Sequence, residues 1–190
     1  MTLTYLVLLI LPIVAFAIAD TFAGLKWGII AAISLAMLAF VANFWLQGGF
    51  ELSSTIEPIL ILVLGLAALR FNDSRWFKFQ PVVANAAIAI LLAYSQIFDT
   101  PLLVKYLPLM KTMLPPETQE LVENPIFLKV MSNTSHHLIY FLIAHGLLVA
   151  WAAMRKSNWV WVIAKLAAYP LLIIFTIFEL VPLMSGVSIP

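Results

Sequence analysis

The chain alternates long apolar runs with short polar segments, a pattern typical of helices that cross a bilayer. A hydrocarbon core of about 30 Å requires roughly 20 predominantly apolar residues per helix. The runs predict about six membrane spans, over residues 3–19, 27–46, 52–71, 81–98, 138–154 and 159–184. The third run is long enough only if residues 52–57 add a turn to it, so the alternative is five spans with one interfacial or re-entrant segment. We predict an all-α, polytopic transmembrane helical bundle, with residues 1–190 forming a single integral membrane domain.

One long connector, residues 99–129, interrupts the apolar pattern and contains five prolines. Four apolar residues of its first half fall on one helical face: Leu103, Leu107, Met110 and Leu114. Lys105 lies on the opposite face of the same segment. An amphipathic helix of this kind lies in the plane of the membrane interface more readily than it crosses the bilayer.

The composition supports the membrane interpretation and excludes several classes of protein. Hydrophobic residues make up 64% of the chain and charged residues 10%, against about 45–50% and about 25% in soluble domains. Soluble, disordered and nucleic-acid-binding proteins all require more polar or basic residues than this chain contains. The chain has no cysteine, which excludes disulfides and thiolate chemistry.

The sixth predicted span contains two ionisable residues, Lys165 and Glu179. Charges within a bilayer are costly, which makes each of them a candidate functional residue. They are separated by a rise of about 21 Å and cannot pair with each other on one unbent helix. The favoured interpretation is that Lys165 extends to the cytoplasmic interface and Glu179 to the outer one. The alternative is a transport or proton pathway in which either residue pairs with a polar group of another helix, and Asp20 and Asp99 are further candidates of lower weight.

Three histidines lie near one another, at positions 136, 137 and 145. His137 and His145 share a broad helical face two turns apart. A zinc site on one helix requires ligands at positions i and i+4, and position 141 is Phe. A two-helix bis-histidine haem clamp is excluded because all three histidines fall on one predicted helix. We therefore predict no metal and no cofactor, and retain His137 and His145 as candidates of lower weight.

Other polar residues of the spans have a simpler interpretation. Asn43, Asn85, Ser95 and Gln96 are of the type that hydrogen-bonds between transmembrane helices. The sequence contains no nucleophile–base set, phosphate loop or dinucleotide fingerprint. We therefore predict that the protein has no catalytic residues and is not an enzyme.

Three stretches of sequence, taken together, resemble a known family. The first is Phe71-Asn72-Asp73 followed by Phe77 and Lys78, and the second is LLAYSQIFDTPL, which contains Ser95 and Gln96. The third contains Trp161, Val162 and Lys165, followed by Phe175 and Thr176. In this order and spacing they resemble the bacterial intracellular septation protein A family, over roughly residues 8–180.

The resemblance implies a non-enzymatic, multi-pass protein of the bacterial inner membrane. It also implies a role in cell-envelope integrity, membrane homeostasis and cell division, through contacts with lipids and with the division or elongation machinery. The family-like positions are Asn72, Asp73, Lys78, Ser95, Gln96, Trp161 and Lys165. The chain departs from the family pattern in its fifth span, where histidines replace an Asn- and Trp-bearing pattern.

The predicted partners are membrane lipids and other inner-membrane proteins, with no nucleic acid. Small residues on the second and fourth spans allow close helix approach and favour self-association. Two alternative functions follow from the residues. One is a small transporter or lipid-translocating protein that uses the intramembrane charges, and the other is an accessory subunit of a larger membrane complex.

Overall fold

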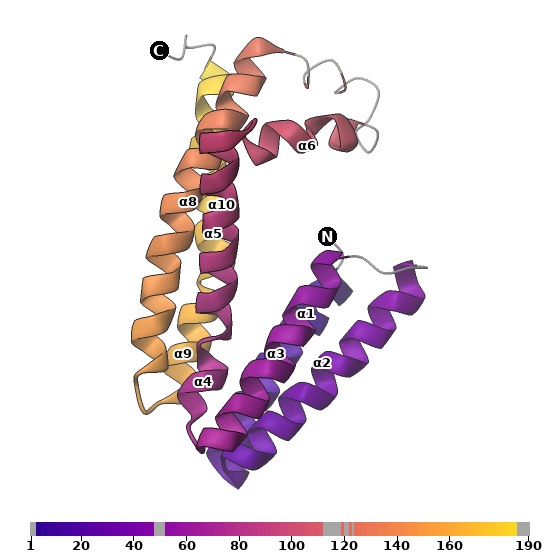
Figure 1. Cartoon of the computed structure of the whole chain (residues 1–190), viewed down its shortest axis with the longest axis vertical. Helices are drawn as coiled ribbons and strands as arrows, with labels where there is room; N and C mark the ends of the chain where they lie inside the picture. Colours follow the sequence, from indigo (N-terminus) through magenta and orange to yellow (C-terminus); the bar gives the residue numbers. More distant parts are fainter. Residues whose placement is uncertain (1–2, 48–51, 112–118, 120–121, 123, 186–190) are drawn as a thin grey trace. The chain divides into compact units, whose positions relative to one another are not determined.

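The computed structural model describes residues 3–47, 52–111, 119, 122 and 124–185, and within them the chain forms helices without strands. The prediction of an all-α, polytopic helical membrane protein is therefore confirmed. In chain order the helices are α1 (Leu3–Ala23), α2 (Leu25–Gln47), α3 (Leu52–Phe71), α4 (Ser74–Lys78), α5 (Gln80–Phe98), α6 (Leu102–Lys111), α8 (Pro125–Ala153), α9 (Asn158–Leu166) and α10 (Ala168–Ser185) (Figure 1).

Four helical segments in the described residues are long and apolar enough to cross a membrane. They are Leu25–Ala42, Ser74–Phe98, Pro125–Ala153 and Asn158–Val181, and a shorter apolar helix covers Ile10–Ala23. Helix α3 has the bounds predicted for the third span. The number of spans and the single membrane domain stay predictions.

The chain divides into two compact units. Unit 1 comprises the described residues of Met1–Ala84 and Leu147–Leu166, and unit 2 those of Asn85–Gly146 and Ala167–Pro190. Helices α5 and α8 each contribute residues to both units.

Unit 1 is built on three neighbouring helices, with α1 packed on α2, α2 on α3, and α9 against α1. The first two predicted spans leave residues 20–26 between them, but the observed connection is shorter. Helix α1 continues to Ala23, and Gly24 alone separates it from α2. Gly24 has φ +87°, a left-handed conformation that favours glycine. At Gly28 the two helices approach so closely that a Cβ would lie 2.7 Å from the Asp20 Cβ.

An aromatic cluster forms the centre of unit 1. The Phe16 and Phe77 rings lie 4.2 Å apart between centroids, and Trp161 packs edge-on against Phe16 at 5.7 Å. All three side chains are buried. The Trp161 indole N–H donates a 2.8 Å hydrogen bond to the Lys78 carbonyl, which satisfies the polar end of a buried tryptophan.

Unit 2 contains residues of α5, α8 and α10, and α6 turns away from them (Figure 1). Helix α8 begins at Pro125, well before residue 138, where the fifth span is predicted to start. Asn124 caps this helix, since its side-chain oxygen accepts a 2.8 Å hydrogen bond from the Ile126 N–H. Pro125 then occupies the first turn, where a missing N–H is tolerated. The polar residues before position 138 are therefore helical.

The predicted sixth span is not one regular helix, because a turn at Ala167 separates α9 from α10. Pro170 explains the interruption: it lacks the N–H that would bond to the Leu166 carbonyl, and its ring clashes with that carbonyl. Helix α6 falls within the predicted amphipathic connector, with Leu107 buried and Lys105 exposed. Leu114 of the same predicted face lies outside the described residues.

Candidate functional site

A cluster of one acid, one amide and one ammonium group lies inside unit 1. The Lys165 Nζ donates to Glu57 Oε1 at 3.2 Å and to Gln80 Oε1 at 3.1 Å. The Gln80 amide nitrogen donates to the same Glu57 oxygen at 3.3 Å. Each side chain therefore contacts the other two, and the three come from α9, α3 and α5.

The members of this cluster differ in their exposure. Gln80 is 3% exposed, and the Lys165 side chain is 10% exposed. The Glu57 side chain is 28% exposed and is the accessible member. Lys165 thus does not extend outward as the favoured interpretation requires, and it pairs instead with polar groups of two other helices.

Glu57 and Gln80 are not among the candidate residues that the sequence indicates. The sequence contains one signal for Glu57, because the predicted third span, residues 52–71, includes this acid. An acid inside a span requires a cationic or hydrogen-bonding partner, and Lys165 was the lysine inside a predicted span.

Two further polar contacts surround the aromatic cluster of unit 1. The Asn158 amide donates to the Asp20 carboxylate at 2.7 Å and joins α9 to α1. Lys78 is 2% exposed, and its ammonium group interacts electrostatically with Asp20 and Asp73. Three family-like positions, Lys78, Trp161 and Lys165, therefore belong to the buried part of one unit.

Asn72 and Asp73 form the junction between α3 and α4. Asn72 has φ +51°, and the next N–H, that of Asp73, donates to the Ala68 carbonyl at 3.1 Å. This is the pattern of a helix ended by a left-handed residue, for which Asn is favoured after Gly. The Asp73 carboxylate caps α4 by accepting a 2.9 Å hydrogen bond from the Arg75 backbone N–H. Hydrogen bonds from the Arg75 side chain also hold the pKa of Asp73 below its ordinary value.

Unit 2 contains two polar contacts that α8 makes with its neighbours. The His145 Nδ1 lies 2.8 Å from the Asn85 amide nitrogen of α5. Phe141, one turn before His145, stacks on the His145 ring. His137 lies one turn earlier still, and its Nδ1 is 2.6 Å from Glu179 Oε1 of α10. His137 and His145 thus share one face of α8, as their spacing predicts.

Glu179 is paired within unit 2. Besides His137, the Thr134 hydroxyl donates to its other carboxylate oxygen at 3.1 Å. The Glu179 side chain is 15% exposed, whereas that of His137 is 55% exposed. Across the described residues, no three His, Asp or Glu side chains converge in a way that could hold a metal ion.

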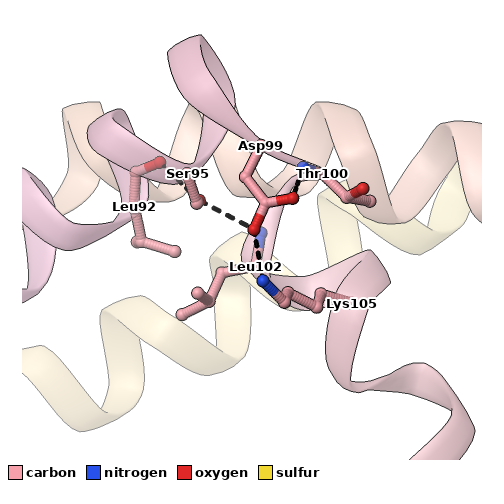
Figure 2. Close-up of polar contacts among 6 residues, drawn as sticks. All are labelled: Leu92, Ser95, Asp99, Thr100, Leu102 and Lys105. Atoms are coloured by element: carbon pink, nitrogen blue, oxygen red, sulfur yellow. Dashed lines mark hydrogen bonds and ion pairs between the residues drawn. The ribbon is translucent and has the colours of Figure 1, made fainter.

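The corner between α5 and α6 contains Ser95 and Asp99 (Figure 2). The Ser95 hydroxyl donates to the Leu92 carbonyl at 2.8 Å and accepts a 3.2 Å hydrogen bond from the Leu102 N–H. Asp99 pairs with Lys105 of α6. This ion pair lowers the pKa of Asp99 and raises that of Lys105 from their ordinary values.

Gln96, next to this corner, differs from the other candidates. Both polar atoms of its side chain are covered by protein and have no hydrogen-bond partner among the described residues. The sequence predicts an interhelical hydrogen bond for this residue, and the structure does not contain one.

Comparison with known proteins places the chain in a family. The family described as intracellular septation protein A matches residues 5–188. A protein of Shewanella pealeana named inner membrane-spanning protein YciB is 27% identical over 179 residues, which cover 94% of this chain and 92% of the relative. Proteins of the same name from Shewanella halifaxensis and Haemophilus influenzae strain PittEE are 27% and 28% identical, over 80% and 51% of this chain and 77% and 53% of their own lengths. No solved structure shows a significant match. This chain is a multi-pass protein of the inner membrane, and it belongs to the intracellular septation protein A family.

Proposed function

We propose that this septation-related inner-membrane protein maintains cell-envelope integrity and membrane homeostasis by contacting lipids and other membrane proteins. We propose further that it does so without catalysing a reaction. The family membership supports the general role, and the distribution of polar and apolar side chains supports the mode of action.

The observation that carries the proposal is that Lys165 and Glu179, the charged residues of the predicted sixth span, pair internally while large apolar side chains face outward. Lys165 pairs with Glu57 in unit 1, and Glu179 pairs with His137 in unit 2. On α5 and α10 the outward side chains include Ile97, 73% exposed, and Phe178, 72% exposed. Such faces are covered in a bilayer by acyl chains or by other helices.

The contacts of the candidate residues support this mode of action. The candidate residues hold helices together: Asn72 and Asp73 join α3 to α4, Ser95 joins α5 to α6, and Trp161 joins α9 to the α4–α5 region. Each of these contacts is a hydrogen bond that connects two segments of the chain.

The first test is deletion of the gene in its native bacterium, with complementation by the intact chain. We expect altered cell length, increased sensitivity to envelope stress and a changed lipid composition, all restored by complementation. An unchanged phenotype on all three measures would contradict the proposal.

Photocrosslinking in intact membranes then tests whether the outward faces make the contacts. A photoreactive residue at Ile97 or Phe178 should form adducts with lipids or with inner-membrane proteins. The matched control places the same residue at Phe16, which is fully buried, and should yield none of these adducts. Equal labelling from the exposed and buried positions would refute contact through these faces.

A further inference from the structure

We propose that the Glu57–Gln80–Lys165 cluster is a proton-binding site, in which Glu57 takes up the proton. The proposal goes beyond the envelope role and does not depend on it. It rests on how hydrogen bonds are distributed over the carboxylate and on which member of the cluster can be reached from outside.

The first observation concerns the two oxygens of Glu57. Both donors, the Gln80 amide and the Lys165 ammonium, use Oε1. Oε2 accepts no hydrogen bond from the residues that the structure describes. A proton can therefore bind Oε2 while both contacts to Oε1 are kept, since a protonated carboxyl group retains acceptor capacity on its other oxygen.

The second observation concerns access. Gln80 and Lys165 are almost fully buried, while more than a quarter of the Glu57 side chain is exposed. Glu57 is thus the member of the cluster that lies at the surface of the unit, and we place proton uptake there. The Gln80 carbonyl keeps a second hydrogen bond on the Lys165 ammonium, so Lys165 retains an acceptor when Glu57 becomes neutral.

The third observation is the isolation of the cluster from the other charges of unit 1. Asp20 of α1 bonds to Asn158, and Asp73 pairs with Arg75. Lys78 interacts with those two carboxylates. Lys26, Arg70, Arg155 and Lys156, the other described cations of the unit, are exposed. The Glu57 carboxylate is therefore the acidic partner of Lys165, and its protonation changes the charge next to a buried ammonium.

The proton balance of the site is simple. With Glu57 ionised and Lys165 protonated, the cluster is neutral overall. Uptake of one proton at Oε2 forms an O–H bond, breaks none within the protein and gives the cluster a charge of +1. The product of this uptake is a carboxylic acid at position 57.

Infrared difference spectroscopy of the full-length protein in lipid nanodiscs detects that acid directly. Spectra at neutral and acidic pH are subtracted for the wild type and for Glu57→Gln, and the two differences are then compared. We expect one carboxylic acid C=O band that is present in the wild type, absent from Glu57→Gln and shifted to lower frequency in D₂O. Lys165→Met should shift this band, because it removes one donor to Oε1.

The exposed acid Asp99 provides the matched control, since Asp99→Asn should leave the Glu57-dependent band unchanged. If Glu57→Gln does not fold, Glu57→Asp retains an acid at this position and should displace the band rather than abolish it. A purely structural ion pair would keep the carboxylate ionised over the whole pH range in which the protein stays helical by circular dichroism. The absence of an acid band that responds to substitution at Glu57, over that range, overturns the proposal.

Discussion

The two units of the molecule bury their polar groups in different ways. Unit 1 surrounds a carboxylate–ammonium pair with a close-packed interior, and nearly all of the largest fully buried side chains belong to it, Trp161, Phe16 and Phe77 among them. Unit 2 contributes Ser135 to that set. Its polar contacts are the amide–imidazole contact of Asn85 with His145 and the half-exposed pair of His137 with Glu179.

The glycines of the two units show the same difference. An added Cβ at Gly28 of unit 1 would overlap Asp20 at 2.7 Å, while one at Gly146 of unit 2 would make an ordinary 3.7 Å contact with Asn85. Close packing matters for the charged cluster, because a buried ion pair is tolerated only where its partners and geometry are fixed. We therefore expect substitutions in unit 1 to cost more stability than comparable substitutions in unit 2.

The largest effect is expected for Trp161→Ala. The substitution removes a buried aromatic ring from the Phe16–Phe77 cluster and leaves the Lys78 carbonyl without its indole donor. Large-to-small changes of this kind cost about 3–5 kcal/mol in unfolding free energy. Trp159→Ala on the same helix is the matched control, since Trp159 is 46% exposed. Denaturant titration in detergent should show a small loss for the control, and equal losses for the two variants would refute the buried cluster.

Next in size is the loss of one partner from the charged cluster. Lys165→Met alone leaves the Glu57 carboxylate without its cation. Breaking a fully buried pair costs about 3–5 kcal/mol, and we expect a smaller loss here because the Glu57 side chain is 28% exposed. The double variant Lys165→Met/Glu57→Gln should lose less than the sum of the two single variants. In unit 2, the Asn85–His145 contact should contribute about 0.6 kcal/mol, the average for interhelical hydrogen bonds in membranes. Double-mutant cycles measure the coupling energy of the Glu57–Lys165 pair and that of the Asn85–His145 contact. Similar coupling energies would contradict the expected difference between the two units.

A smaller effect separates Gly28→Ala from Gly146→Ala. The first forces α1 and α2 apart at Asp20, and overpacking of this kind costs about 1–3 kcal/mol. The second meets no close atom and should be neutral or slightly stabilising, because Ala is favoured over Gly in a helix interior by about 1 kcal/mol. Thermal unfolding of the two variants in the same detergent tests the difference. Equal shifts of Tm would show that the two units are packed with similar closeness at these positions.

The sequence predicts the helices of this protein far better than it predicts their contacts. The range of α3 follows from its apolar run together with the turn contributed by residues 52–57. The start of α8 could not be predicted in this way, because the polar residues before position 138 break the apolar pattern. Their helical conformation is accommodated by partners such as Glu179, which contacts Thr134 and His137 from a distant segment.

The candidate site shows the same division more sharply. Lys165 and Glu179 could be found from local sequence, since an ionisable residue in an apolar run is conspicuous. Glu57 lies more than one hundred positions before Lys165, and hydrophobic periodicity carries no information about which helices become neighbours. The interruption at Ala167 was accessible in principle from Pro170, whereas the pairing of Glu57 with Gln80 depends on tertiary structure alone.

The smallest effect is expected at the α5–α6 corner of unit 2, where the charged partners are exposed. The pKa of Asp99 is lowered by Lys105, so the ion pair contributes fully above the ordinary carboxyl value of 3.8 and is lost as the pH falls through the lower folded value. The pKa of Lys105 is raised, so the contribution is also lost as the pH rises through a value above 10.5. A spin label at Tyr106 should therefore report greater motion of α6 at both extremes and none of this change between them. Asp99→Asn should abolish the increase in motion at acidic pH. Ser95→Ala removes an uncharged contact to the Leu102 N–H and should raise the motion at every pH. If the increase in motion at acidic pH persists in Asp99→Asn, another group causes it, and the corner is then held by Ser95 rather than by the ion pair.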